Sequence, residues 1–156
     1  MPLHAPAIDP QDVAPNTGSG YPEVFRNRVL PRERRALGDA LGLTKIGVNL
    51  TTLAPGKESS MRHWHTHEDE FIYVVSGEIV LRTDAGEQTL TAGQCAGFKA
   101  GVADGHQFLN RTATTALYLA ISNRDGQDGG FYPDVDMVMH PDGTPHTFTH
   151  KDGTPY

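Results

Sequence analysis

From Ile46 to Ser122 the sequence is a series of short, strand-like segments separated by glycine and proline turns. Turn pairs such as Ser76-Gly77 and Ala92-Gly93 fall between the segments. About eight strands at this spacing predict an all-β sandwich or barrel, and the lack of ten-residue helical patterns argues against a parallel βαβ sheet. The expected strands are Ile46–Leu53, Ser60–His65, Glu70–Val75, Glu78–Thr83, Gln88–Thr91, Cys95–Phe98, Gln107–Asn110 and Leu117–Ser122.

The sequence before this series has a different composition. Residues 1–22 are rich in proline, alanine, aspartate and glycine, which predicts an irregular N-terminal arm. Pro31 is a favoured first-turn residue and Gly42 can end a helix, so we expect one short helix at Arg32–Leu41.

The sequence after the series predicts a hairpin. Val135–Met139 and His146–Thr149 flank the turn tetrapeptide Asp142-Gly143-Thr144-Pro145. We therefore expect three parts along the chain: an arm with a short helix at 1–45, a β-barrel at 46–123, and a tail at 124–156 whose hairpin packs on the barrel.

The composition is that of one globular domain. The chain has 156 residues, of which 37% are hydrophobic and 21% charged, so it can form a core and is too apolar for a disordered protein. The formal net charge of −6 argues against a nucleic-acid partner. Five arginines lie close together and fit either a solvated face or contact with a phosphate or carboxylate group. They are Arg26, Arg28, Arg32, Arg34 and Arg35.

Cysteine and apolar content indicate the compartment. Cys95 is the only cysteine, so an internal disulfide is impossible and a reducing compartment is expected. We expect Cys95 to be a small core residue. Residues 1–22 lack an apolar run, and no window reaches the ~18 apolar residues of a membrane helix. The sequence therefore predicts a cytoplasmic protein without a membrane partner.

The segment from His63 to Glu70 contains three imidazoles and three carboxylates directly before an apolar run. Side chains alternate along a strand, so His63 and His65 are expected to face the same way. A lone ionised carboxylate at Glu70 would be costly at the start of a buried strand unless it is paired or metal-bound. Neutral imidazole and carboxylate suit divalent transition metals, so the segment predicts a metal site.

Here the sequence resembles the cupin superfamily of small antiparallel β-barrels, over roughly residues 47–122. The first cupin motif is present as Pro55-Gly56, six residues, His63-Trp64-His65, four residues, Glu70, six residues and Gly77. Only its initial spacer is longer than the usual form, by one residue. Small bacterial single-domain cupins show the same motif followed by a tail, so the resemblance implies a jelly-roll fold and a bound metal.

The second cupin motif is altered. Gly93 and Lys99-Ala100-Gly101 begin it, with lysine where proline is usual, and His106 with Asn110 ends it. The gap before His106 is four residues instead of two, so strict spacing would make Asp104 the ligand. The retained His-x-x-x-Asn ending favours His106, and Asp104 remains the alternative.

The resemblance implies His63, His65, Glu70 and His106 as ligands of one divalent transition metal. Iron, manganese, nickel, zinc and copper all fit the donor set, and six-coordination would leave two positions for substrate oxygens. Alternation predicts a mostly apolar pocket around the metal, lined by Met61, Ile72, Val74, Phe108 and Asn110.

These features predict a metal-dependent enzyme for a small oxygen-rich substrate, sugar-like or a diol or enol, acting by isomerisation or O₂-dependent cleavage. The candidate acid/base groups are His67 and Glu68, although both also fit solvated turn positions. The arginine segment would neutralise a substrate phosphate if it folds over the pocket. The alternative is a non-catalytic metal-containing module that binds or senses a small molecule. We also expect a homodimer, with Trp64 on the outer strand face as a possible contact.

Overall fold

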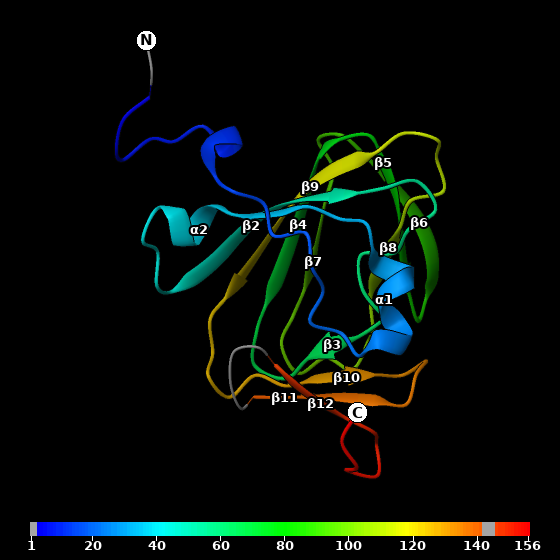
Figure 1. Ribbon diagram of the computed structural model, residues 1–156. Coiled ribbons are helices and arrows are strands. Elements are labelled where there is room, and N and C mark those ends of the chain that lie inside the picture. Colours follow the sequence, from blue (N-terminus) through cyan, green and yellow to red (C-terminus); the bar gives the residue numbers. More distant parts are fainter. Residues whose placement is uncertain (1–2, 142–145) are drawn as a thin grey trace.

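The computed structural model describes residues 3–141 and 146–156 (Figure 1). The predicted all-β class is confirmed, because the described residues contain twelve strands and their ladders are antiparallel. The expected turn at residues 142–145 lies outside the described residues. None of the helices in the described residues has the length and apolarity required to cross a membrane.

The N-terminal region differs from the prediction. The regular elements there are a 3-10 helix at Pro10–Asp12, helix α1 at Glu23–Val29, strand β1 at Arg34–Ala36 and helix α2 at Leu37–Ala40. The single helix expected at Arg32–Leu41 is therefore wrong for most of its length. Backbone pairing with the edge of a sheet makes Arg34–Ala36 a strand, because β1 pairs antiparallel with the next strand. Helix α1 has no counterpart in the prediction.

The largest sheet has five strands in the order β1-β2-β9-β4-β7. Its further members are β2 at Ile46–Leu53, β9 at Ala116–Asn123, β4 at Glu70–Ser76 and β7 at Cys95–Phe98. A three-stranded sheet has the order β6-β5-β8, with β6 at Gly86–Thr91, β5 at Glu78–Thr83 and β8 at Gln107–Leu109. Seven of the eight strands predicted from Ile46 onward match strands of these two sheets. The eighth, expected at Ser60–His65, is a strand only at Trp64–His65 and belongs to another sheet.

A third sheet joins the tail to the start of the metal-site motif. Its order is β12-β11-β10-β3, and it lies at the lower end of the molecule in Figure 1. The strands are β3 at Trp64–His65, β10 at Gly130–Tyr132, β11 at Met137–His140 and β12 at Thr147–Thr149. The predicted tail hairpin is confirmed by the β11–β12 pair. Strand β10, which was not predicted, pairs with β3 and fixes His65 opposite Gly130.

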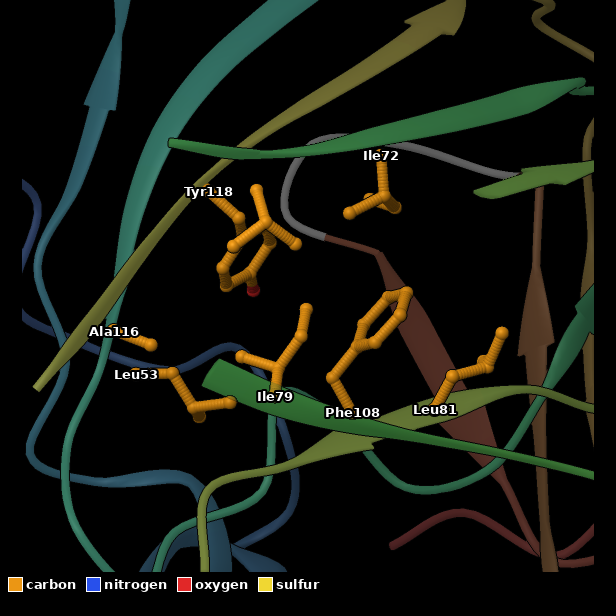
Figure 2. Close-up of a cluster of buried hydrophobic side chains, with 8 residues drawn as sticks. Leu53, Ile72, Ile79, Leu81, Phe108, Ala116 and Tyr118 are labelled. Atoms are coloured by element: carbon orange, nitrogen blue, oxygen red, sulfur yellow. The ribbon is translucent and has the colours of Figure 1, made fainter. Parts of the chain in front are cut away.

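The principal core fills the space between the five-stranded and three-stranded sheets (Figure 2). Figure 2 shows Ile72 and Tyr118 of the first sheet pointing toward Ile79 and Phe108 of the second. A second buried cluster lies beside α1 and the tail sheet, and comprises Tyr21, Val29, Met61, Tyr132, Met137 and Met139. The metal-site motif runs between the two clusters, because Met61 belongs to the second cluster and Ile72 to the first.

Strand alternation places most of the expected lining residues inside. Ile72, Val74 and Phe108 are at most 3% exposed. Cys95, in contrast, is exposed, so its predicted role as a core residue is wrong. The reason is register: Cys95 pairs with Tyr73, which faces outward, whereas Ile72 pairs with Ala96.

Candidate metal centre

Four residues that the sequence singled out converge at one place between the sheets. His63 and His106 lie on adjacent backbone segments joined by two hydrogen bonds, with N–O distances of 3.1 and 2.8 Å. His65 lies on β3, and Glu70 is the first residue of β4. Ligand atoms of His63, Glu70 and His106 all lie within 4.8 Å of one another. His65 joins them, since its Nε2 atom lies 3.1 Å from Nε2 of His63.

The hydrogen bonds behind the rings define which nitrogens carry protons. Nδ1 of His63 lies 2.9 Å from the carbonyl oxygen of Met61, and Nδ1 of His65 lies 2.7 Å from a carboxylate oxygen of Asp128. Both acceptors require Nδ1 to donate a hydrogen. In the neutral rings, the two Nε2 lone pairs therefore face each other across 3.1 Å. A cation between them would turn this repulsion into ligation.

Burial and charge set the protonation of the cluster. Burial lowers the pKa of His63 to about 3, so its ring is neutral and able to bind a metal. Burial acts to raise the pKa of Glu70, but the His106 hydrogen bond and the neighbouring histidines outweigh it and bring the value to about 2. Burial also lowers the pKa of His65, yet the Asp128 hydrogen bond and nearby carboxylates produce a net upward shift.

The His106 ring is held by aromatic packing and by a contact with Glu70. Its ring stacks on Phe98 with centroids 3.6 Å apart, and its Nε2 atom lies 2.7 Å from Oε2 of Glu70. Nδ1 of His106 is buried without a hydrogen-bond partner in the described part of the chain. The alternative ligand, Asp104, does not join the cluster, because its carboxylate accepts a hydrogen bond from the backbone N–H of Asp84 at 2.8 Å. The geometry therefore favours His106 over Asp104.

These observations meet the chemical requirements of a divalent metal. The donors are three imidazoles and one carboxylate, two of the rings are oriented by hydrogen bonds, and two lone pairs converge. A buried His/Glu/His group on a cupin fold indicates a possible metal site, whose preferred metal the donor set leaves open.

Asp128 is a member of the candidate site that the sequence analysis does not predict. It is 6% exposed and accepts hydrogen bonds from the backbone N–H groups of His67 and Glu68, at 2.8 and 3.1 Å. Its other oxygen accepts the His65 Nδ1 hydrogen. The residue lies in a glycine-rich stretch that resembles an ordinary turn, and no spacing rule connects it with His65. Only the pairing of β10 with β3 brings the two together.

The cluster lines a cavity of about 720 Å³. Other walls of this cavity come from Tyr118 on β9, Tyr132 on β10 and the N-terminal residues Arg32 and Arg34. Of the lining residues predicted from alternation, Ile72 and Phe108 line this cavity, whereas Met61, Val74 and Asn110 are buried but do not line it. The cavity is large enough for a small organic molecule.

The two acid/base candidates differ in position. Glu68 lines the cavity, is half-buried and lies close to His65 and Asp128. Burial is the largest cause of the upward shift in the pKa of Glu68. His67 is exposed, does not line this cavity, and its Nδ1 atom lies 2.8 Å from Oγ1 of Thr66. The structure thus brings Glu68, but not His67, to the cavity.

Comparison with known proteins identifies the family. The cupin domain profile matches residues 49–122. A structure described as a sugar phosphate isomerase of the cupin superfamily, from Silicibacter pomeroyi DSS-3, is 41% identical, covers 97% of this chain and 96% of its own, and has a TM-score of 0.92. The chain therefore belongs to the cupin superfamily, as the motifs implied.

Two further structures show how far the similarity extends. One from Acidithiobacillus ferrooxidans ATCC 23270, described as a candidate sugar phosphate isomerase, is 30% identical over 80% of each chain, with a TM-score of 0.72. A predicted oxalate decarboxylase from Thermotoga maritima is 20% identical, covers 75% of this chain and 97% of its own, and has a TM-score of 0.60, so it shares the fold alone. A search of curated proteins gave no match.

Proposed function

We propose that this protein is a metal-dependent cupin isomerase for a small sugar-like substrate, with sugar phosphates as the first candidates. The observation that carries the proposal is that Glu68 and the four proposed ligands, His63, His65, Glu70 and His106, line one cavity. The two structures at 41% and 30% identity, both described in terms of sugar phosphate isomerisation, support this choice over O₂-dependent cleavage.

Isomerisation needs a polarised carbonyl and a group that moves a proton. A divalent cation bound by the cluster would supply the first, because it polarises the carbonyl and hydroxyl oxygens of a substrate. Glu68 would supply the second: its carboxylate would take the proton from the hydroxyl-bearing carbon next to the carbonyl and deliver it to the former carbonyl carbon, while the proton of that hydroxyl would pass to the former carbonyl oxygen. The partly buried position of Glu68 suits this role, since burial shifts the pKa of its carboxyl upward, in the direction that strengthens a base.

Two buried tyrosines can hold the substrate. Burial raises the pKa of Tyr118 and of Tyr132, so both phenols stay protonated. The Tyr132 hydroxyl interacts with Tyr21 and that of Tyr118 with Thr51, and each oxygen can still accept a hydrogen bond from a substrate hydroxyl. The ring of Tyr132 stacks on His63 with centroids 5.4 Å apart, beside the cluster. Both residues line the cavity, where a substrate hydroxyl would meet them.

The test is an isomerisation assay with the metal-loaded protein and a panel of aldose and ketose phosphates, followed by proton NMR in D₂O. A proton carried by Glu68 exchanges with solvent, so we expect product formation together with deuterium at the carbon that receives the proton. Glu68→Gln should abolish both while leaving the metal bound. Ligand-induced thermal stabilisation without turnover would instead support the non-catalytic binding module, and O₂ uptake would support oxygenase chemistry.

The homodimer expected from the sequence remains a proposal, and the structure offers two exposed apolar surfaces as its contact. Phe71, Tyr73 and Val75 face outward from β4, with 38–42% of their surface exposed. Trp64 stacks on Phe131, whose surface is 41% exposed, with ring centroids 4.8 Å apart. Sedimentation of the full chain measures the mass directly. A lower mass for Phe71→Glu would place the contact on β4, and a lower mass for Phe131→Glu would place it beside Trp64.

A further inference from the structure

Arg32 and Arg34 stand out among the arginines of the described residues. Arg28, Arg35, Arg62, Arg111 and Arg124 each form an ion pair with a carboxylate. Arg32 and Arg34 form none within the described ranges, although both line the cavity that holds the His/Glu cluster. Two cationic groups beside a cavity, neither of them in an ion pair with a described carboxylate, are the pattern expected of an anion site.

The backbone holds both arginines at the cavity wall. The N–H and carbonyl groups of Arg34 pair with those of Asn16, at 2.9 and 2.8 Å. Arg32 reaches only carbonyl oxygens, of Gly18 at 3.3 Å and Ser59 at 3.4 Å, and both distances are long for hydrogen bonds. The guanidinium of Arg34 makes no hydrogen bond to another described residue, so its donors remain available.

The electrostatics favour a bound anion. Arg34 is exposed to solvent on one side, and its pKa is lowered by desolvation at the cavity wall and by the positive charge of Arg32, while Asp39 acts in the opposite direction. The two guanidinium groups therefore repel each other while remaining charged. An anion between them would remove this repulsion and receive hydrogen bonds from two planar donor groups.

The cavity wall around the two arginines consists of small and polar residues. Gly18, Ser19 and Gly20 line the cavity next to the arginines, in the segment between the 3-10 helix and α1. Ser59 and Ser60 line it as well, with their hydroxyl oxygens 3.3 Å apart. Small residues let an anion approach the backbone closely, and hydroxyl groups add donors.

We infer that Arg32 and Arg34 form the subsite that binds a phosphate monoester on the substrate, in the same cavity as the His/Glu cluster. A phosphate monoester has a second pKa of about 6 and is close to a dianion at neutral pH, which matches two guanidinium charges. This inference rests on the proposed function, because the phosphate belongs to the sugar-like substrate. It assigns recognition of the phosphate to the N-terminal segment and leaves the chemistry to the cupin strands.

The test is calorimetric titration of the full-length, metal-loaded protein with inorganic phosphate, repeated after chelation of the metal. We expect one phosphate per chain, retained after chelation. Arg32→Gln and Arg34→Gln should each weaken phosphate binding by roughly tenfold or more. Arg82→Gln is the matched control, since Arg82 is exposed on β5, forms no ion pair within the described ranges and lies outside the cavity. Its phosphate affinity should equal that of the wild type.

Two results would overturn the inference. In the first, phosphate binds equally to all variants and is lost on chelation, which would show that it binds the metal. In the second, the protein binds no phosphate, which would show that the subsite is absent. Arg34→Gln keeps the test valid if Arg32→Gln fails to fold, because the Arg34 guanidinium makes no internal hydrogen bond. The titration needs no turnover, so phosphate binding in a protein without isomerase activity would refute the proposed reaction and leave the subsite standing.

Discussion

His65 and Asp128 are 63 positions apart in the sequence, yet Nδ1 of His65 lies 2.7 Å from a carboxylate oxygen of Asp128. The contact links β3 to the loop before β10, and it makes the His65 ring present its Nε2 lone pair to the cluster. A carboxylate behind a metal-binding histidine fixes the tautomer and raises the basicity of the ligand. The tail of the chain therefore contributes a residue to the candidate metal centre.

The first prediction concerns this hydrogen bond. Asp128→Asn keeps an oxygen for the N–H groups of His67 and Glu68 but can place an amide donor opposite His65. The ring would then protonate Nε2 and lose its lone pair for the metal. We expect metal affinity, measured by competition with a chelating dye, to fall by about 10- to 100-fold.

The control is a second histidine–aspartate pair, located outside the cavity. Nδ1 of His150 lies 2.9 Å from an exposed Asp136 carboxylate that belongs to neither the cavity nor the cluster. Asp136→Asn should leave metal affinity unchanged. Equal losses in the two variants would show that the His65–Asp128 bond has no special role.

The second prediction separates the two acid/base candidates. Glu68→Gln should lower the isomerisation rate at least 100-fold at full metal occupancy, because the amide cannot accept the proton. His67→Gln should change the rate by less than about twofold, since His67 is exposed outside the cavity. Steady-state rates at saturating substrate provide the measurement. The reverse ranking would remove Glu68 from the mechanism.

The third prediction is a pH dependence of stability. Arg62 follows Met61 in the metal-site motif and forms ion pairs with Asp134, at 2.7 Å, and with Asp84. The Arg62 hydrogen bond lowers the pKa of Asp134 below that of a free aspartate. A lowered native pKa adds stability above the unfolded value, about 3.9, and this stability is lost as the pH falls through the native value.

Arg62→Gln should therefore lower the free energy of unfolding by about 1–2 kcal/mol at pH 7, a modest figure because both carboxylates are partly exposed. The difference from the wild type should shrink as the pH falls below about 4. Urea denaturation at both pH values checks this. A difference that grows on acidification would contradict the assigned ion pairs.

The fourth prediction concerns Gly77, which ends the first cupin motif. Its φ is +81°, and a Cβ there would lie 2.9 Å from Cα of Ala116. Gly77→Ala should destabilise the protein by about 2–4 kcal/mol, from backbone strain and a clash with a neighbouring strand. Gly93→Ala, with φ of +90° and open space around the Cβ, should cost only about 1–2 kcal/mol. Thermal unfolding of the two variants measures the difference in stability that the clash at Gly77 causes. Equal losses of stability would show that there is no clash.

Much of the β fold could be predicted because strand alternation and turn residues act locally. Strands β2, β5 and β7 begin and end where the pattern of apolar residues and glycines indicated. The same local rules failed at β1, because its conformation depends on pairing with β2 rather than on its own residues. The sequence misplaces Cys95 in the core, because a cysteine is small and apolar but its orientation depends on the register of β7 with β4.

The candidate site likewise has residues that local spacing predicts and residues that depend on contacts between distant segments. His63, His65, Glu70 and His106 were chosen by spacing, and the structure brings them together. Asp128 could not be found, because its role arises from a contact between β3 and a distant loop. Among the arginines, sequence proximity could not distinguish Arg32 and Arg34, which line the cavity, from Arg28, which pairs with Glu58.

The central claim is that one divalent cation binds between His63, His65, Glu70 and His106. Elemental analysis of the full-length protein, purified without an affinity tag and incubated with first-row divalent ions, tests it most directly. We predict one ion per chain, lost in His106→Gln and in Glu70→Gln but retained in His140→Gln, a histidine of β11 outside the cavity. A wild-type protein that stays free of metal, or variants that keep the same metal content, would contradict the account.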